Sequence, residues 1–335
     1  MPTAPDLPDG DVPGVVVVLA SLNADLVVAV DARPRGGETV LGGDLVVHPG
    51  GKGANQAAAA ALAGARVRVV GRVADDAYGP MLRDALSAAG ADVSGVRVTD
   101  DVATGVALIL VTPDGENSIV VASGANARVD ADDVTAGFGS DVAVAVAQLE
   151  VPVEAVTALA RQCLAAGARL VLNAAPPEAR LSAEVLRVCD PLVVNAHEAS
   201  ALTGAPVADS VETARSAAEA LLRGGCRSVV LTLGSAGAVV LDGSSSWHVA
   251  APPVDRVVDT TGAGDCLVGT LAARLAAGDD LPTATADAVR TATLAVQRAG
   301  AQPSYVTREV AIGVPPTTPV PLGGTRGEAV SSNAL

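Results

Sequence analysis

Aromatic side chains are almost absent from this 335-residue sequence, which has one phenylalanine, one tryptophan and two tyrosines. Half of the residues are nevertheless hydrophobic, so the chain can bury the core of one large domain or two moderate ones. That core has to be built from valine, leucine and alanine. A pocket for a flat ring is accordingly expected to have aliphatic walls.

Positive charge is also scarce, since the formal net charge is −15. We expect no nucleic acid as a partner, because phosphate backbones bind clustered Lys and Arg. Small phosphorylated ligands remain possible because they need positive potential only locally.

Cysteine pairs and long apolar runs are missing as well. The four cysteines lie far apart and form no C-x-x-C motif, which favours reduced thiols over a disulfide framework or a zinc site. No apolar run approaches the length of a membrane span. The acidic, proline-rich N-terminus lacks the basic segment of a signal peptide. We therefore expect a cytoplasmic protein without membrane association.

Short valine-rich runs alternate with alanine-rich segments of helical length. This rhythm predicts an α/β fold with a doubly wound, mostly parallel sheet flanked by helices. The predicted strands lie at residues 15–19, 66–70, 142–147, 169–172, 192–194 and 228–231, and the predicted helices at 54–63, 78–89, 152–166 and 211–223.

Two regions break this rhythm, residues 26–47 and 104–121. Each carries two strand-like pieces around a turn, and Asp114-Gly115 in the second is a strong hairpin signal. They predict a small second sheet inserted into the α/β body, and a small sheet beside a large one usually makes a ligand cleft. We expect one domain over residues 15–311, with disordered tails at 1–14 and 314–335.

The first predicted strand is followed by SLNADLVV. Asn23 and Asp25 are two residues apart, so in an extended chain their side chains point the same way. An amide and a carboxylate together suit vicinal hydroxyl groups, and open α/β sheets bind ligands at the carboxyl ends of their strands. Taken alone, however, this stretch favours an Asx turn.

The glycine-rich stretch PGGKGANQ begins at Pro49. It fits neither the Walker pattern nor G-x-G-x-x-G, so its glycines are better explained as letting the backbone approach a small polyol, with Asn55 bonded to it. The alternative is a glycine-rich helix start with Lys52 solvated. Glu150, at the end of another predicted strand, is by itself best explained as a solvated residue before a helix.

Two later segments have a functional and a structural interpretation each. Asn195 and Glu198 either face a cleft together at a helix start or form a capping box, and the pattern favours neither. Residues 232–237 are either an ordinary hairpin or a loop whose amides and Thr232 hydroxyl approach a nucleotide phosphate.

The stretch VVDTTGAGDCLVGT places Asp265 at the start of a predicted helix, directly behind two glycines. The unpaired amides of a helix start attract an anion, and a carboxylate beside them can accept the proton of an attacking hydroxyl. Phosphoryl transfer needs this combination. An Asp that only caps a helix needs neither the glycines nor Asp259 upstream, so the pattern favours phosphoryl transfer.

Taken in order, these motifs resemble the ribokinase / phosphofructokinase-B family of sugar kinases. The resemblance covers roughly residues 15–311, and all the motifs together are specific although each alone is weak. It rests on SLNAD, GGKGANQA, GENSIVV at 115–121, N-x-x-E at 195–198, DTTGAGD at 259–265 and GAQPS at 300–304.

The resemblance implies a role for each set of residues. Asp265 is implied as the catalytic base, beside an anion hole of Gly262, Ala263 and Gly264. The implied sugar site comprises Asn23, Asp25, Gly51, Lys52, Gly53, Asn55, Glu150 and Asp265. The implied nucleotide site comprises Asn195, Glu198, Thr232, Leu233, Gly234, Ser235, Ala236, Gly237 and Gly264, with Glu198 organising Mg²⁺ largely through water. The implied site for a monovalent cation, K⁺ in most of the family, comprises Asp259, Thr261, Ala295, Arg298, Gly300 and Ser304.

The activity implied by the resemblance is ATP-dependent phosphorylation of D-ribose at O5. The resemblance also implies that the small inserted sheet, formed from about residues 26–47 and 104–121, is a lid over the site and the interface of a homodimer. Leu267 and Val289 stand where the family commonly has more aromatic or polar residues, so we expect a less polar and less aromatic adenine pocket. Three alternatives stay open: a related kinase for another sugar or a nucleoside, a sugar-binding regulator without catalysis, and a dinucleotide oxidoreductase, whose glycine fingerprint is missing.

Overall fold

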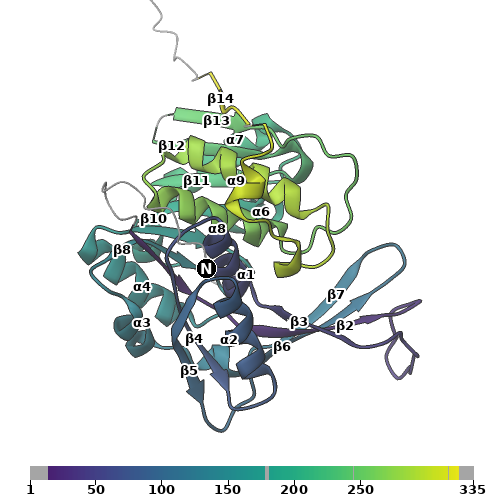
Figure 1. Cartoon of the computed structure of the whole chain (residues 1–335). Helices are drawn as coiled ribbons and strands as arrows, with labels where there is room; N and C mark the ends of the chain where they lie inside the picture. Colours follow the sequence, from purple (N-terminus) through teal and green to yellow (C-terminus); the bar gives the residue numbers. More distant parts are fainter. Residues whose placement is uncertain (1–13, 178–180, 244, 316, 324–335) are drawn as a thin grey trace, which may run out of the picture.

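A ten-stranded sheet runs through the middle of the protein (Figure 1), seen in a computed structural model that describes residues 14–177, 181–243, 245–315 and 317–323. The strands from β11 to β5 are parallel, and β12, β13 and β14 add antiparallel strands at one edge. In spatial order they are β14 (Val320–Pro321), β13 (Ser245–Val249), β12 (Ala238–Asp242), β11 (Ser228–Thr232), β10 (Cys189–Asn195), β9 (Arg169–Asn173), β8 (Val142–Ala147), β1 (Val15–Leu19), β4 (Val67–Ala74) and β5 (Asp92–Thr99).

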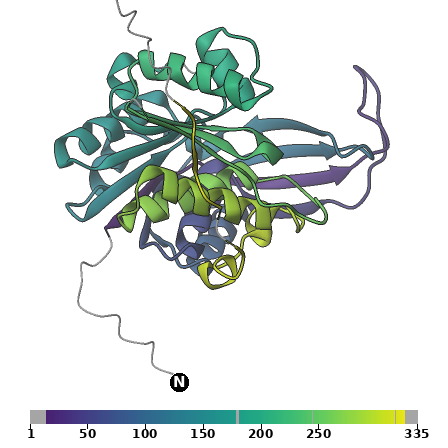
Figure 2. The same ribbon diagram turned by 90° about the horizontal axis from the view of Figure 1, so that it is seen from above.

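Helices cover both faces of this sheet (Figure 2). Val16 and Val18 of β1 pack into one apolar core, whereas Val15, Val17 and Leu19 pack into the other, as the two-residue period of a strand requires. The first core is covered by α1 (Lys52–Leu62), α2 (Tyr78–Ala88), α8 (Ala263–Ala276) and α9 (Leu281–Ala295). The second is covered by α3 (Ala131–Gly137), α4 (Val153–Ala166), α5 (Ala183–Leu186), α6 (Ala196–Thr203) and α7 (Val211–Arg223).

A separate four-stranded sheet projects from the side of the body as an arm (Figure 1). Its strands are β3 (Val46–Gly50), β2 (Asn23–Ala29), β6 (Gly105–Val111) and β7 (Asn117–Ala122), in that order. The chain leaves the body through β2, returns through β3, and makes the second excursion through the β6–β7 hairpin. The short helix η1 (Gly124–Arg128) follows β7 where the chain rejoins the body.

The predicted α/β architecture with its small inserted sheet is confirmed. The small sheet begins earlier than expected, because β2 starts at Asn23. One expectation for the C-terminal tail is wrong. Val320–Pro321 pairs with β13 instead of being disordered, and the Leu322 amide donates to the Ser246 carbonyl at 2.8 Å. A short edge strand of this kind carries too few residues for a sequence pattern to reveal it.

The other predicted tail segments, residues 1–13 and 324–335, lie outside the described residues. Within the described part of the chain, no helix has both the length and the apolar character needed to cross a membrane. The described residues also form three further short elements: η2 (Gly234–Ala236), η3 (Gln302–Ser304) and α10 (Arg308–Ala311).

Candidate active site

The carboxyl ends of β1 and β8 lie side by side at the point where the order of strands in the sheet reverses. From β1 the chain builds β4 and β5 on one side, whereas β8 and the strands after it lie on the other. Open α/β sheets bind ligands at such a switch point. Ser21 follows β1, Glu150 follows β8, and the Ser21 hydroxyl donates to Glu150 Oε2 at 2.7 Å.

The start of α1 is fastened to the same place. The Lys52 amide donates to Glu150 Oε2 at 3.1 Å, and the Gly53 amide donates to Ser21 Oγ at 3.1 Å. Gly51 has a φ of 90°, and a Cβ there would lie 2.7 Å from the Ser21 carbonyl oxygen. Only glycine allows the two backbones to approach so closely, which explains the glycines before α1.

The charges of three carboxylates act on Lys52, the only lysine in the chain. Burial acts to lower the pKa of Lys52, but the charges of Asp265, Glu150 and Glu198 outweigh that effect and the pKa is raised. Burial, reinforced by the charges of Glu150 and Asp265, raises the pKa of Asp25 from 3.8 to about 7. The site is therefore acidic and rich in acceptors, with one cationic side chain among its carboxylates.

Asp265 lies in the first turn of α8 but does not cap the helix. The N-cap is Gly262, which has a φ of 73° and makes no side-chain cap. Within the described part of the chain, the amide N–H groups of Gly262, Gly264 and Asp265 have no acceptor, whereas Thr261 donates to Asp259 Oδ1 and Ala263 to the Thr260 carbonyl. The helix start thus offers three free donors, in part the set expected from the sequence.

The Asp265 carboxylate is instead held by α1. Asn55 Nδ2 donates to Oδ2 at 3.1 Å and Gln56 Nε2 donates to Oδ1 at 2.9 Å. Burial raises the pKa of Asp265, while the charge of Lys52 and the two amide donors act in the opposite direction. Asp265 is thus a buried carboxylate whose charge is supported from two sides.

Asn195 and Glu198 form the capping box of α6. The Asn195 side chain accepts from the Glu198 amide at 2.8 Å, and Glu198 Oε2 accepts from the Asn195 amide at 2.8 Å. Burial raises the pKa of Glu198, opposed by the Asn195 hydrogen bond and the charge of Lys52. The expectation of a capping box is therefore correct. Glu198 also belongs to the site electrostatically, because its charge and that of Lys52 act on each other.

Residues 232–237 connect β11 to β12 as a hairpin that contains η2. Thr232 pairs with Asn195 across the parallel β10–β11 ladder, so this loop lies beside the start of α6. The Leu233 amide donates to the Gly237 carbonyl at 2.8 Å. The sequence expectation of an ordinary hairpin is met, and its place next to Asn195 leaves the nucleotide interpretation open as well.

Asp259 joins the two segments expected to hold a monovalent cation. Its Oδ1 accepts from the Thr261 amide at 2.9 Å and its Oδ2 from the Gly300 amide at 2.8 Å. Both oxygens thus hold backbone in place, and burial of Asp259 is outweighed by these bonds, so that its pKa is lowered. Ser304 is fully buried, and its hydroxyl donates to the Ala301 carbonyl at 2.8 Å. Ala295 is the last residue of α9, and the Arg298 amide, in the turn that follows, donates to the Ala295 carbonyl.

Several residues at the site had no role in the sequence interpretation. Gln302 Nε2 donates to Asn55 Oδ1 at 3.0 Å, Gln148 Nε2 donates to Gln56 Oε1 at 2.8 Å, and the Tyr305 hydroxyl donates to the Gly262 carbonyl at 2.9 Å. Gln56 and Gln302 stand inside the motifs GGKGANQA and GAQPS. These two motifs therefore indicated the segments that form the site. They did not indicate which side chains lie near Asp265, because that depends on the rotation of α1 and on the conformation of the loop.

The donor set fits a magnesium ion that is held mainly by water and nucleotide. Among the described residues, no group of three or more His, Cys, Asp or Glu side chains is arranged to hold a metal ion. Glu198 has both carboxylate oxygens already bonded to Asn195, so it can support such an ion through water. For a monovalent cation, the fit rests on oxygen donors alone, namely the carbonyls near Asp259 and Gly300.

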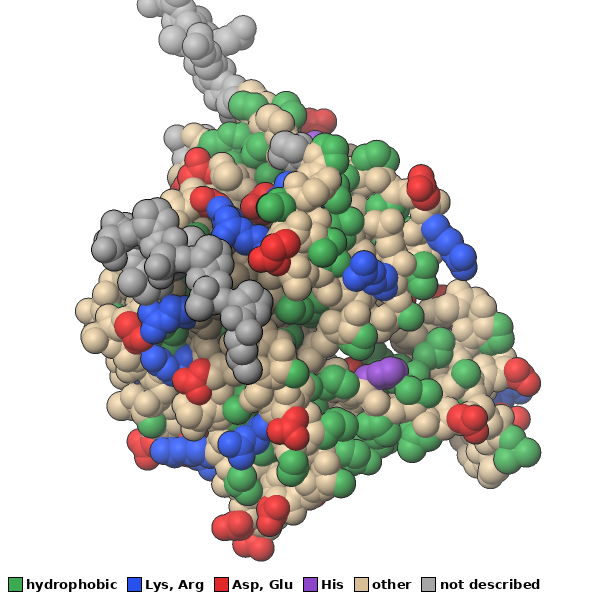
Figure 3. All heavy atoms as spheres, viewed as in Figure 1, with side chains coloured by type: hydrophobic (Ala, Val, Ile, Leu, Met, Phe, Trp, Pro, Cys, Tyr) green, Lys and Arg blue, Asp and Glu red, His purple; other side chains and the backbone are tan. Residues whose placement is uncertain are grey.

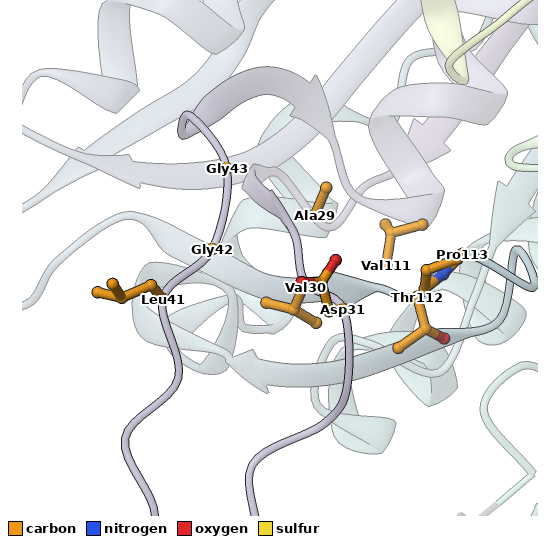
Figure 4. A pocket seen from close by; sticks show the side chains of 9 residues that line it. All are labelled: Ala29, Val30, Asp31, Leu41, Gly42, Gly43, Val111, Thr112 and Pro113. Atoms are coloured by element: carbon orange, nitrogen blue, oxygen red, sulfur yellow. The ribbon is translucent and has the colours of Figure 1, made fainter.

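A cavity of about 450 Å³ lies away from these carboxylates, on the small sheet (Figure 4). Its walls come from the end of β2, the chain before β3 and the end of β6. Leu41 borders it with 93% of its surface exposed. This hollow shares none of its lining residues with the Asp265 site.

The whole sequence from residue 15 to residue 308 matches the pfkB family of carbohydrate kinases. The chain belongs to this family. It is 36% identical over 299 residues to a ribokinase of Schizosaccharomyces pombe, a match that covers 86% of this chain and 94% of the relative. A deoxyribokinase of Salmonella typhi is 32% identical over 292 residues, with 87% and 95% covered. The structure of Arabidopsis thaliana ribokinase complexed with ribose and ATP superposes with a TM-score of 0.82 at 30% identity, covering 90% of this chain and 98% of that one.

Proposed function

We propose that this protein phosphorylates D-ribose at O5 with ATP, giving D-ribose 5-phosphate and ADP. Membership of a carbohydrate kinase family supports it, as does similarity to ribokinases. The single observation that carries the chemistry is the start of α8, where the Asp265 carboxylate leaves its own helix uncapped beside free amides. That is the combination required by phosphoryl transfer to a hydroxyl.

Ribose binds between the body and the small sheet in this proposal. Asn23 and Asp25 at the start of β2, the glycine turn at Gly51, and Asn55 with Glu150 supply its hydrogen-bonding partners. These buried and half-buried polar groups favour a polyol over an apolar ligand, since a sugar hydroxyl can both donate to a carboxylate and accept from an amide. Lys52 and Gly53 hold the turn through Glu150 and Ser21.

Asp265 accepts the proton of the 5-hydroxyl as O5 attacks the γ-phosphorus. The bond from O5 to phosphorus forms, the bond from phosphorus to the bridging oxygen breaks, and ADP leaves with that electron pair. The free amides at the start of α8 bind the equatorial oxygens, whose charge changes in the transition state. Mg²⁺, when bound with the nucleotide, neutralises phosphate charge. General-base catalysis contributes about 10²–10⁴-fold, and positioning with electrostatics contributes the rest.

The nucleotide lies along α6 and the β11–β12 hairpin. Asn195 and Glu198 are near its phosphates, and residues 232–237 with Gly264 line its path. The register between Asn195 and Thr232 supports this proposal because it brings both segments to one edge of the sheet. Leu267 and Val289 are buried in the α8–α9 core, in keeping with an aliphatic adenine pocket.

A monovalent cation, K⁺ in this proposal, binds beside the α8 start. Asp259, Thr261, Ala295, Arg298, Gly300 and Ser304 form its surroundings. The bonds from Thr261 and Gly300 to Asp259 support it, because they bring two segments 41 residues apart into contact. The cation would fix the loop so that the anion-hole amides are aimed before charge develops.

The small sheet pairs with a second copy of the chain to form a homodimer. Large apolar side chains lie exposed on the arm, including Leu108 at 50%, Ile119 at 55% and Val120 at 66%, and Figure 3 shows hydrophobic side chains gathered along it. A surface of this kind on a small sheet favours an interface. Sedimentation is expected to give a dimer at micromolar concentration, and a monomer would contradict this part of the proposal.

One assay tests the proposed function against its alternatives: ADP release over a panel of pentoses, hexoses, deoxyribose and nucleosides. We expect ribose to give the highest kcat/KM. A preference for 2-deoxyribose is the second candidate, favoured by the similarity to a deoxyribokinase. No ADP release with any member of the panel would instead support a sugar-binding regulator.

A further inference from the structure

Asn126 is a fully buried amide that touches the proposed sugar site from outside its motifs. It lies in η1, where the chain returns to the body after β7, and only 1% of its surface is exposed. Its Oδ1 accepts from the Leu22 amide at 2.8 Å. Its Nδ2 donates to the Leu22 carbonyl at 3.0 Å and to Asn23 Oδ1 at 2.8 Å.

The backbone of Leu22 fixes which way the Asn126 amide faces. A backbone N–H can only donate and a backbone carbonyl can only accept, so the oxygen of Asn126 must face the Leu22 N–H and its nitrogen the Leu22 carbonyl. The second hydrogen of Nδ2 then points at the side chain of Asn23. This end of the Asn23 amide must therefore be its oxygen.

The orientation of Asn23 follows from that of Asn126. With Oδ1 bonded to Asn126, the Nδ2 group of Asn23 is left without an acceptor among the residues described here. Asn23 is only 2% exposed as a residue, but its Nδ2 atom is not sealed off from solvent. It is therefore the end of the side chain that remains open to a ligand, two residues along β2 from Asp25.

A glycine makes room for this pair of amides. Gly105 begins β6, opposite Asn23 in the small sheet. A Cβ at Gly105 would collide with Asn126 Nδ2 and Asn23 Oδ1, and would lie 2.7 Å from the Leu22 carbonyl oxygen. The hydrogen bond between Asn126 and Asn23 therefore lies where three segments meet, namely β2, β6 and η1.

We propose that Asn126 is a positioning residue that fixes Asn23 as a hydrogen-bond donor to a sugar oxygen. The inference rests on the proposed function, in which Asn23 and Asp25 bind the sugar. Asn23 then donates to a hydroxyl oxygen, while the ionised Asp25 accepts a hydroxyl proton. Asn23 is thus fixed as the donor and Asp25 as the acceptor, although an asparagine side chain by itself can either donate or accept.

The test is Asn126→Asp, which keeps the size of the side chain and its acceptor for the Leu22 amide. The aspartate cannot donate to Asn23, so the Asn23 amide turns over and presents its oxygen to the sugar. We expect the KM for ribose to rise about tenfold or more, as for a polar group left unsatisfied. The KM for ATP should stay unchanged and kcat should change far less than the ribose KM.

A double-mutant cycle separates positioning from general loosening of the fold. In the Asn23→Ala background, Asn126→Asp should change the ribose KM by less than about twofold, because the side chain it orients is gone. Thr104→Val is the matched control. Thr104 precedes Gly105 and holds the start of β6 against the body: its hydroxyl accepts from the Ala74 amide at 2.9 Å and donates to Asp76 at 2.8 Å. It has no hydrogen bond to Asn23. It should leave the ribose KM unchanged.

Gly105→Ala provides a second route if Asn126→Asp does not fold, since its Cβ displaces the same amide pair and should raise the ribose KM. An unchanged ribose KM in Asn126→Asp, or an equal rise with and without Asn23, would overturn the inference. If Asn23→Ala raises the ribose KM and Asn126→Asp does not, the positioning role alone fails. If the wild-type protein does not phosphorylate ribose, the proposed function fails and this inference fails with it.

Discussion

Two helix starts in this protein carry a carboxylate at the same position, and they use it differently. In α6, Glu198 lies three residues after its N-cap and closes a capping box with Asn195. In α8, Asp265 also lies three residues after the N-cap, but the N-cap is Gly262 and no side chain caps the helix. Asp265 bonds instead to Asn55 and Gln56 on another helix.

The difference shows what makes a carboxylate available for chemistry. Glu198 stabilises its own helix, and its oxygens accept from the amide and side chain of Asn195. Asp265 leaves the amides of its helix start free and is held in place from across the site. A carboxylate that does not serve its own helix start, next to amides that have no acceptor, is suited to accept a proton beside an anion.

Removing the charge of Asp265 should have the largest effect. Asp265→Asn keeps the shape but cannot accept a proton, so we expect kcat to fall by about 10²–10⁴-fold. Sugar binding, measured by calorimetry, should remain nearly intact. A variant with kcat near that of the wild type would show that Asp265 is structural, as Glu198 is in its capping box.

Asp25→Ala should have the next largest effect, and on binding instead of turnover. The loss leaves a sugar hydroxyl and its buried neighbours unsatisfied, at a cost of about 1–3 kcal/mol or more where a charge is involved. We expect a steep rise in the ribose KM with little change in the ATP KM, measured by initial rates. An equal rise in both constants would move Asp25 out of the sugar site.

The choice of salt should have a smaller effect, acting on the α8 start alone. Replacing K⁺ with a bulky organic cation at constant ionic strength should lower activity several-fold, with Na⁺ a poorer substitute, when Mg²⁺ is saturating. The α6 start, which its own capping box holds, offers no reason for such a dependence. Equal rates in the three salts would show that the hydrogen bonds which Asp259 accepts from the Thr261 and Gly300 amides are sufficient to fix the loop.

The smallest expected effect is a shift in pH dependence. The pKa of Asp25 is raised to about 7 by burial and by the charges of Glu150 and Asp265. Protonation removes its ability to accept from the sugar, so kcat/KM for ribose should fall as the pH drops below about 7. The apparent pKa belongs to the coupled carboxylates.

Glu150→Gln removes one of the charges that raise the pKa of Asp25. The acid limb of kcat/KM should therefore move to lower pH in this variant, whatever its effect on the rate itself. A limb that stays in place would mean that another group titrates. The absence of any limb between pH 6 and 8 in the wild type would remove Asp25 from the account.

The sequence was sufficient to predict the α/β class, the central parallel strands, the small inserted sheet and the segments that gather at the site, whereas β5, β13 and β14 were not predicted. Strand alternation in β1 and the glycines before α1 and α8 act locally, so their pattern can be read along the chain. The contacts of Asp265 were less predictable. Asn55 and Gln56 are neighbours on α1, and which of their side chains reaches Asp265 depends on how α1 is rotated against α8. Asn126 was missed entirely, since its three hydrogen bonds join residues more than 100 positions apart.

A magnesium titration of two variants compares the two carboxylates most directly. Initial rates of Asp265→Asn and Glu198→Gln would be measured with saturating ribose and ATP while Mg²⁺ is raised. We expect Glu198→Gln to regain much of its rate at high Mg²⁺, because Glu198 is proposed to support the ion only through water, whereas Asp265→Asn should stay slow at every concentration. Recovery of Asp265→Asn by Mg²⁺, to a rate near that of the wild type, would contradict the role of Asp265 as the proton acceptor.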